Sequence, residues 1–354
     1  MVGFGIATGW SALVCSVAMW AVMFLAYKSS NVLEDKDPNQ FVNWLLAIAA
    51  AFAVLSVFPS TQLMFGGWYN EPLAISNLPH YLLPLPSRLE RAIGAAGYLG
   101  IVFALLKTLR LLERRPRFTL LFILNPTVLL VLFGHNGVFV LFMCAAWAFW
   151  FLIKGGWWIA FAFLGLSFGF GILGLALVGI FLKHLISRTA REQWPRQLAL
   201  AVVAYCACAS LVMLPYGPQK VLSILVLPWT GSIGMVGILL GLAILVTIAF
   251  LYRAELSGKD TALFASLFVM TLLVVTGLAI SITPFILLLV AAIPFRSAPQ
   301  LWLTFAIGVI ALLPNVHSTD ALVIAAISVF VILMILQSRH AWKETGLFTT
   351  IDVR

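Results

Sequence analysis

The sequence predicts an all-α, polytopic integral membrane protein. Of its 354 residues, 63% are hydrophobic and 9% are charged, and the mean hydropathy is +1.09. A soluble domain needs about a quarter of its residues charged, so this composition excludes a soluble enzyme, a disordered chain and a collagen-like rod. The formal net charge is +9, but the basic residues lie in short gaps between apolar runs, as is typical of residues that fix membrane orientation. We therefore expect the lipid bilayer as a partner, and no nucleic acid.

Apolar runs recur along the whole chain, and each is a candidate membrane segment. A spanning helix needs about 20 mostly apolar residues, and several runs are shorter, which favours short or re-entrant helices. The candidate segments are Gly3 to Tyr27, Val42 to Met64, Ile93 to Leu112, Phe118 to Phe133, Val138 to Ile153, Trp157 to Leu182, Gln197 to Leu214, Gly234 to Tyr252, Thr261 to Ile282, Phe285 to Pro294, Leu301 to Leu313 and Thr319 to Gln337. We expect about 11–13 membrane segments, with residues 1–214 as an N-terminal module and residues 215–354 as C-terminal transmembrane helices. The first run is too long for a cleaved secretion signal and lacks its basic start.

Two dense basic loops set the predicted orientation. Their basic residues are Lys107, Arg110, Arg114, Arg115 and Arg117 in one loop, and Lys183, Arg188, Arg191 and Arg196 in the other. Both loops should be cytoplasmic, so an even number of crossings separates them. The run from Trp157 to Leu182 must then be split, and its many glycines allow a break or close helix contact. We predict two half-length helices there, with close packing at Gly165 and Gly169.

This topology gives a strong charge asymmetry. Of the 21 Lys and Arg residues, only Arg88, Arg91 and Lys220 fall outside the cytoplasm. The predicted outer loops are Phe65 to Arg91, Gly134 to Gly137, Pro215 to Ser232 and Pro314 to Ser318. Charges inside the membrane are the usual mark of coupled transporters, and the middles of the confident spans carry none. Polar groups cluster at outer helix ends instead, which suits a surface site for a lipid-linked substrate.

The first outer loop is the richest in candidate site residues. It reads Phe-Gly-Gly-Trp-Tyr-Asn-Glu-Pro from Phe65, and Leu-Pro-His-Tyr-Leu-Leu-Pro-Leu-Pro follows from Leu78. Trp and Tyr favour the headgroup layer and proline preorganises turns, so we expect an ordered loop. Glu71 could act as a general base on an acceptor hydroxyl, or it is simply a solvated acid. The candidate substrate contacts of this loop are Tyr69, Asn70 and His80, although His80 could equally hydrogen-bond its neighbours.

A second candidate lies in the hairpin that follows the first basic loop. Asn125 and Pro126 should break the helix in mid-segment and expose backbone carbonyls, which a membrane tolerates only against protein or a water-filled cavity. The Gly-His-Asn-Gly sequence that starts at Gly134 forms a tight outer turn. Either its glycines serve the turn alone, or His135 and Asn136 bind a phosphate or a sugar hydroxyl.

These elements together resemble the central part of the GT-C glycosyltransferases. The resemblance rests on the Leu-Asn-Pro sequence and the Gly-His turn, on Leu85 and Pro86 at the end of the first loop, on the basic loop around Arg114, and on the Gly-Leu-rich segment from Leu164 to Ala176. It covers roughly Phe65 to Arg196.

The resemblance implies transfer of a hexose, such as mannose, from a polyprenyl-phosphate donor to a glycan or lipid acceptor at the outer face. A base deprotonates the acceptor hydroxyl, which displaces polyprenyl phosphate with inversion. Cationic groups stabilise the leaving phosphate. The outer candidates are Arg88, Arg91 and Lys220, each of which could instead snorkel to the interface. We expect no cofactor, and a multi-pass location in the plasma membrane if the protein is bacterial.

Departures from the family pattern keep other functions open. The family usually has an aspartate in the first outer loop, but no Asp lies between Asp37 and Asp260; either Glu71 substitutes, or the orientation of the first two helices differs. The turn also lacks its usual aspartate, and the Gly-Leu-rich segment lacks its usual lysine. An inactive relative, a polysaccharide polymerase and a lipid-linked-sugar flippase therefore stay as alternatives. We predict no metal site, because the pair Cys206 and Cys208 lacks a second pair of ligands.

Overall fold

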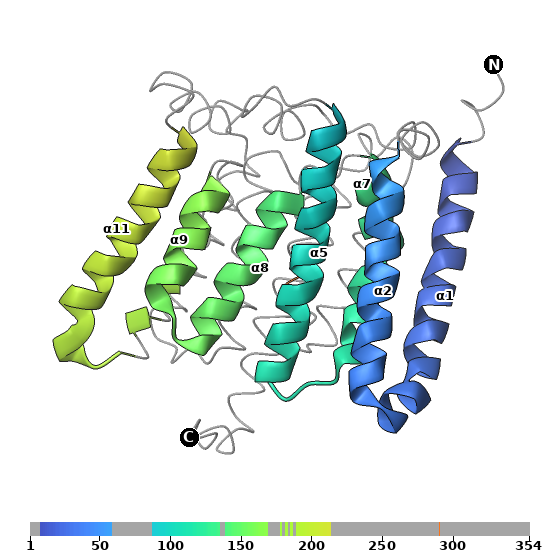
Figure 1. The fold of residues 1–354 in the computed structure, drawn as a ribbon, viewed down its shortest axis with the longest axis horizontal. Coiled ribbons are helices and arrows are strands. Elements are labelled where there is room, and N and C mark those ends of the chain that lie inside the picture. Colours follow the sequence, from blue (N-terminus) through green and yellow to red (C-terminus); the bar gives the residue numbers. More distant parts are fainter. Residues whose placement is uncertain are drawn as a thin grey trace, which may run out of the picture.

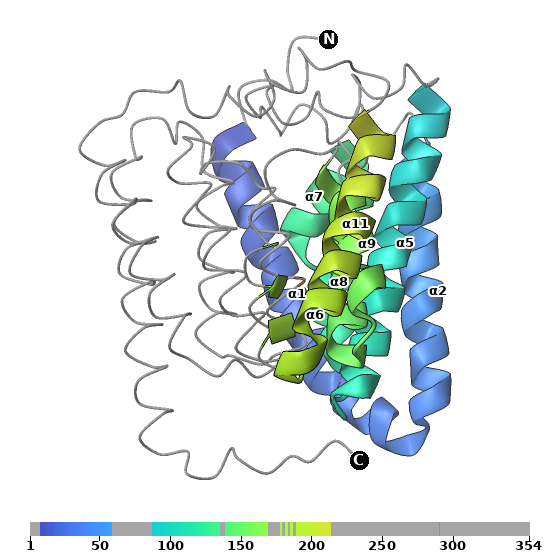
Figure 2. The ribbon, with the colours of Figure 1, turned by 90° about the vertical axis from the view of Figure 1, so that its left-hand side faces the viewer.

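The computed structural model describes residues 8–58, 87–134, 139–168, 178, 181–182, 185–186, 189–213 and 290. These ranges are helical and contain no strand, which confirms the predicted all-α class for this part of the chain. Helices α2 (Pro38–Val57), α5 (Ser87–Leu111), α8 (Phe139–Lys154), α9 (Trp157–Phe168) and α11 (Trp194–Met213) form a row in which each packs on the next (Figure 1). Helix α1 (Thr8–Lys36) and the short α6 and α7 pack behind α2 and α5 (Figure 2).

Helices α1 and α2 form a hairpin whose turn is set by Asp37. Its backbone is extended, and its side chain accepts hydrogen bonds from the N–H groups of Asn39 and Gln40, both at 3.0 Å. Pro38 occupies the first helical position, where a missing N–H costs nothing. Because of this cap, α2 begins before the predicted start at Val42.

Two of the described helices could span a membrane. In the described part, Pro38–Val57 and Arg91–Leu111 are long and apolar enough to cross it. Helix α8 is described over 16 residues and α9 over 12, and the residues before α8 and after α9 lie outside the described ranges. The total of about 11–13 segments depends largely on residues 215–354, which lie outside the described ranges apart from 290.

The predicted break at the Asn-Pro sequence is confirmed. A 3-10 turn, η2 (Pro116–Thr119), leads into α6 (Leu120–Ile123), and α7 (Pro126–Gly134) begins after the break. Leu124 leaves the helical conformation at φ −97°, ψ 5°. Proline disfavours helical backbone at the residue before it and lacks the N–H that would continue the ladder, so the segment divides at this point.

Glycines let neighbouring helices approach closely. A Cβ on Gly97 would lie 2.8 Å from the backbone of Phe139, which fixes the start of α8 against α5. A Cβ on Gly165 would meet the Tyr205 carbonyl oxygen and lie 3.0 Å from Cys208 Cβ, which confirms close packing of α9 on α11. Helix α9 is described as far as Phe168; Gly169 and most of the expected second half-helix lie outside the described residues.

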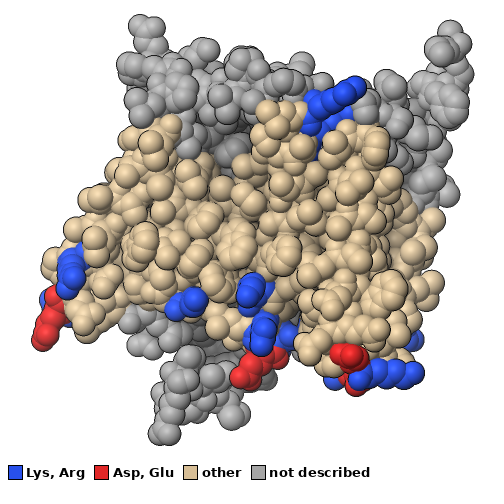
Figure 3. All heavy atoms as spheres, in the orientation of Figure 1, with Lys and Arg blue, Asp and Glu red and all other residues tan. Residues whose placement is uncertain are grey.

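Charged side chains separate to the two ends of the helices. On the face drawn in Figure 3, the described Lys, Arg, Asp and Glu residues lie near the ends, with uncharged side chains between them. Arg88 and Arg91 are in the first turns of α5, whereas Arg110 is in its last turn. The described basic residues of the other helices lie at the same end as Arg110. This is the separation that the sequence predicted.

Candidate functional site

Most of the predicted site residues lie outside the part of the chain that the structure describes. They are Tyr69, Asn70, Glu71, His80, His135, Asn136 and Lys220. The structure does describe Arg88 and Arg91, three residues apart and hence neighbours on α5. Arg88 is exposed and Arg91 is half-buried. Both lie at the end of the molecule opposite the other described Lys and Arg residues.

The first described residues of α8 pack against the middle of α5. Phe139 lies beside Gly97, and Gly97 is about 15 Å along the helix axis from Ser87 at 1.5 Å per residue. The Gly-His-Asn-Gly sequence spans Gly134 to Gly137, and Val138 separates it from Phe139. Residues 135–138 lie outside the described ranges.

The Asn-Pro break lies at the same depth and is sealed by protein. The Tyr98 hydroxyl donates a hydrogen bond to the Ile123 carbonyl at 3.4 Å, and the Tyr98 ring stacks on Phe122 with centroids 5.7 Å apart. Asn125 is fully buried, and its Oδ1 accepts a hydrogen bond from the Val128 N–H at 3.4 Å. Asn125 thus caps α7, and the carbonyl freed at Ile123 meets the Tyr98 hydroxyl.

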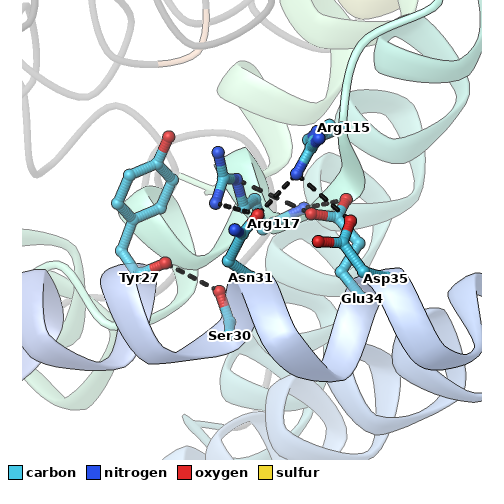
Figure 4. Close-up of polar contacts among 7 residues, drawn as sticks. All are labelled: Tyr27, Ser30, Asn31, Glu34, Asp35, Arg115 and Arg117. Carbon is cyan, nitrogen blue, oxygen red and sulfur yellow. Dashed lines mark hydrogen bonds and ion pairs between the residues drawn. The ribbon is translucent and has the colours of Figure 1, made fainter.

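A charged cluster that the sequence reasoning missed lies at the other end of α5. It consists of Asn31, Glu34, Asp35, Arg115 and Arg117 (Figure 4). Arg117 Nε lies 3.6 Å from Glu34 Oε2, and Arg115 Nη1 lies 3.3 Å from Asp35 Oδ1. Asn31 Oδ1 accepts hydrogen bonds from both guanidinium groups, the one from Arg117 at 2.7 Å. The cluster ties the end of α1 to the loop between α5 and η2.

The aromatic ring of Tyr27 supports the cluster from one side. The Arg117 guanidinium lies 5.0 Å from the Tyr27 ring centroid, within the range of a cation–π contact. The Tyr27 ring also lies 5.5 Å from that of Phe118. Arg117 is therefore held by a carboxylate, an amide and a ring together.

Glu34 is the electrostatically unusual member of this cluster. Its side chain is 5% exposed, and this burial raises the pKa of Glu34, while the backbone N–H and the charge of Arg117 oppose the rise. A buried carboxyl of this kind can mark a catalytic acid or base. Here Arg117 covers the Glu34 carboxyl and pairs with it, so Glu34 serves to hold α1 against η2.

The charged cluster also bears on the acids before the second helix. Glu34 and Asp35 pair with the basic loop, so they lie on the same side as that loop and opposite Arg88. The sequence carries one signal for this pairing, a group of acids after the first apolar run and a group of arginines after the third.

Among the described residues, no group of three or more His, Cys, Asp or Glu side chains could hold a metal ion. No family model, curated protein or solved structure matches the sequence.

Proposed function

We propose that the chain is a multi-pass membrane glycosyltransferase that transfers a hexose from a polyprenyl-phosphate donor to a glycan or lipid acceptor at the outer face. The observation that carries the proposal is the position of Arg88 and Arg91 at one end of α5, apart from the other described basic residues. All other described basic residues lie at the opposite end, and by the positive-inside rule that end is cytoplasmic. The pair is then outside, at the headgroup level where a lipid-linked phosphate lies.

The neighbouring sequence supplies the remaining groups for such a reaction. The sequence before α5 carries Glu71 and His80, and the sequence before α8 carries His135 and Asn136. In the proposal these residues bind the sugar and the acceptor, while Arg88 and Arg91 hold the phosphate. The resemblance to the GT-C glycosyltransferases implies such a transfer from polyprenyl phosphate.

In the proposed reaction, Glu71 takes the proton of the acceptor hydroxyl, and the hydroxyl oxygen attacks the anomeric carbon of the donor sugar. The bond from that carbon to the phosphate oxygen breaks, and polyprenyl phosphate leaves with its negative charge. Arg88 and Arg91 stabilise this charge as it develops. The stereochemistry at the anomeric carbon inverts, since one displacement occurs.

The test measures transfer of radiolabelled hexose from polyprenyl phosphate by membranes that contain the full chain. Removal of a general base costs roughly 100-fold to 10,000-fold in rate, so Glu71→Gln should lose at least about 100-fold. Asp35→Asn, in the charged cluster at the other end, is the matched control and should transfer normally. Absence of transfer by the wild type, with the donor moved intact across the bilayer, would support the flippase instead. Equal transfer by Glu71→Gln and the wild type would refute the role of Glu71.

A further inference from the structure

The cytoplasmic end of the helix row carries a basic rim whose geometry points to a lipid. The rim consists of Lys107 and Arg110 on α5, Lys154 on α8 and Arg196 on α11, all exposed. On the face drawn in Figure 3, separate groups of basic side chains lie along this edge of the row, with acidic side chains among them. The described acids nearest to the rim residues in the sequence are Glu113 and Glu192, so the four basic residues outnumber them.

Helix register brings these residues to one level. Gly97 meets Phe139 and Gly100 meets Met143, so α5 and α8 run parallel with a constant offset. The same offset places Lys154 beside the last turn of α5, where Arg110 lies. Helices α9 and α11 both start from this end and also run side by side, with Gly165 against Tyr205. Arg196 in the first turn of α11 is therefore at a similar height.

Exposed apolar side chains lie directly beside the cations. Phe103, one turn from Lys107 on α5, is 45% exposed, and Trp158 at the start of α9 is 57% exposed. The Lys154 ammonium lies 4.8 Å from the Trp150 ring centroid. Tryptophan favours the membrane interface, and long basic side chains extend from apolar surface to the headgroups. A molecule that fits this surface has an acyl part and an anionic head.

We propose that the basic rim binds anionic phospholipid of the cytoplasmic leaflet, with the phosphodiester group on Lys107, Arg110 and Lys154 and an acyl chain along Phe103. An acidic peptide would match the charges but not the apolar side chains next to them. The proposal rests on the membrane orientation of the proposed function, and not on sugar transfer. Each basic residue near a membrane surface contributes about a fivefold preference for anionic lipid at low salt.

The test offers the purified full chain equimolar phosphatidylglycerol and phosphatidylcholine and measures the bound lipids by native mass spectrometry. The wild type should prefer phosphatidylglycerol, and the double variant Lys107→Gln, Arg110→Gln should lose about 25-fold of this preference. The matched control is Lys28→Gln with Lys36→Gln, which removes two exposed charges from α1 outside the rim and should keep the preference. Lys107→Arg with Arg110→Lys, which keeps both charges, should keep it as well.

Three outcomes would overturn the proposal. One is no preference in the wild type, and another is equal loss in the two double variants, which would indicate a general effect of net charge. The third is release of the chain from membranes by alkaline carbonate, which would also refute the membrane location in the proposed function. The lipid-binding experiment contains no sugar donor. A chain that fails to transfer hexose should therefore still show the expected preference for phosphatidylglycerol.

Discussion

Glu34 and Arg117 form an ion pair with 3.6 Å between Oε2 and Nε, and it joins α1 to η2. The Arg117 backbone N–H also donates to Glu34 Oε1 at 3.4 Å. The Glu34 side chain is 5% exposed and that of Arg117 is 17% exposed. Water screens this pair weakly, so it should contribute more to stability than the exposed pair of Arg115 and Asp35 beside it.

Arg117→Gln should therefore destabilise the protein by about 2–3 kcal/mol, because it leaves the buried Glu34 carboxylate without its cation. The measurement is thermal unfolding of the full chain in detergent at neutral pH. The matched control is Arg115→Gln, whose pair with Asp35 has side chains 48% and 57% exposed and should cost at most about 1 kcal/mol. Equal losses in the two variants would show that the burial of Glu34 has no energetic effect.

Glu34 should also make stability depend on pH. Burial raises the pKa of Glu34 above its ordinary 4.5, so the folded chain keeps this proton at a pH where the unfolded chain has lost it. The stabilisation from protonated Glu34 is complete below the ordinary pKa and is lost as pH rises through the raised pKa. Glu34→Gln, which stays neutral, should become more stable relative to the wild type as pH rises above the ordinary pKa of 4.5. A stability difference that stays constant over this range would contradict the argument.

Two glycines one turn apart on α5 should respond differently to a methyl group. In Gly97→Ala the new Cβ would lie 2.8 Å from the Phe139 backbone. A helix backbone cannot rotate away from this contact as a side chain can. In Gly100→Ala it would meet the flexible end of the Met143 side chain instead. We expect Gly97→Ala to cost about 1–3 kcal/mol, and Gly100→Ala to cost little because alanine favours the helix by roughly 0.5–1 kcal/mol. Thermal unfolding measures both, and a smaller cost at Gly97 than at Gly100 would refute the packing of α8 on α5.

Asn125→Ala should destabilise the protein by about 1–2 kcal/mol. The substitution removes the side-chain oxygen that accepts from the Val128 N–H, and alanine is a poor helix cap. Pro126→Ala is the control at the next position. It should cost less stability, because alanine keeps the first turn of α7 and leaves the Asn125 cap in place. Unfolding temperatures of the two variants decide the matter, with the reverse order as the contradicting result.

Local features of this protein could be predicted from the sequence, and contacts between distant segments could not. The break at Pro126 follows from the missing N–H of one residue, and the isolated position of Arg88 follows from counting crossings between basic loops. The pairing of Glu34 with Arg117 joins residues 83 positions apart, and depends on the angle at which α1 packs on η2. Periodicity and composition carry no information on that angle. The register of α8 against α5 likewise depends on the contact of Gly97 with Phe139.

The most direct test of the account is the sidedness of the two ends of α5. In a variant that lacks the four native cysteines, single cysteines are introduced by Arg88→Cys or Arg114→Cys and exposed to a membrane-impermeant maleimide. The account predicts that residue 88 is labelled in intact cells and that residue 114 is labelled only after permeabilisation. Labelling of residue 114 in intact cells, with residue 88 protected, would contradict it.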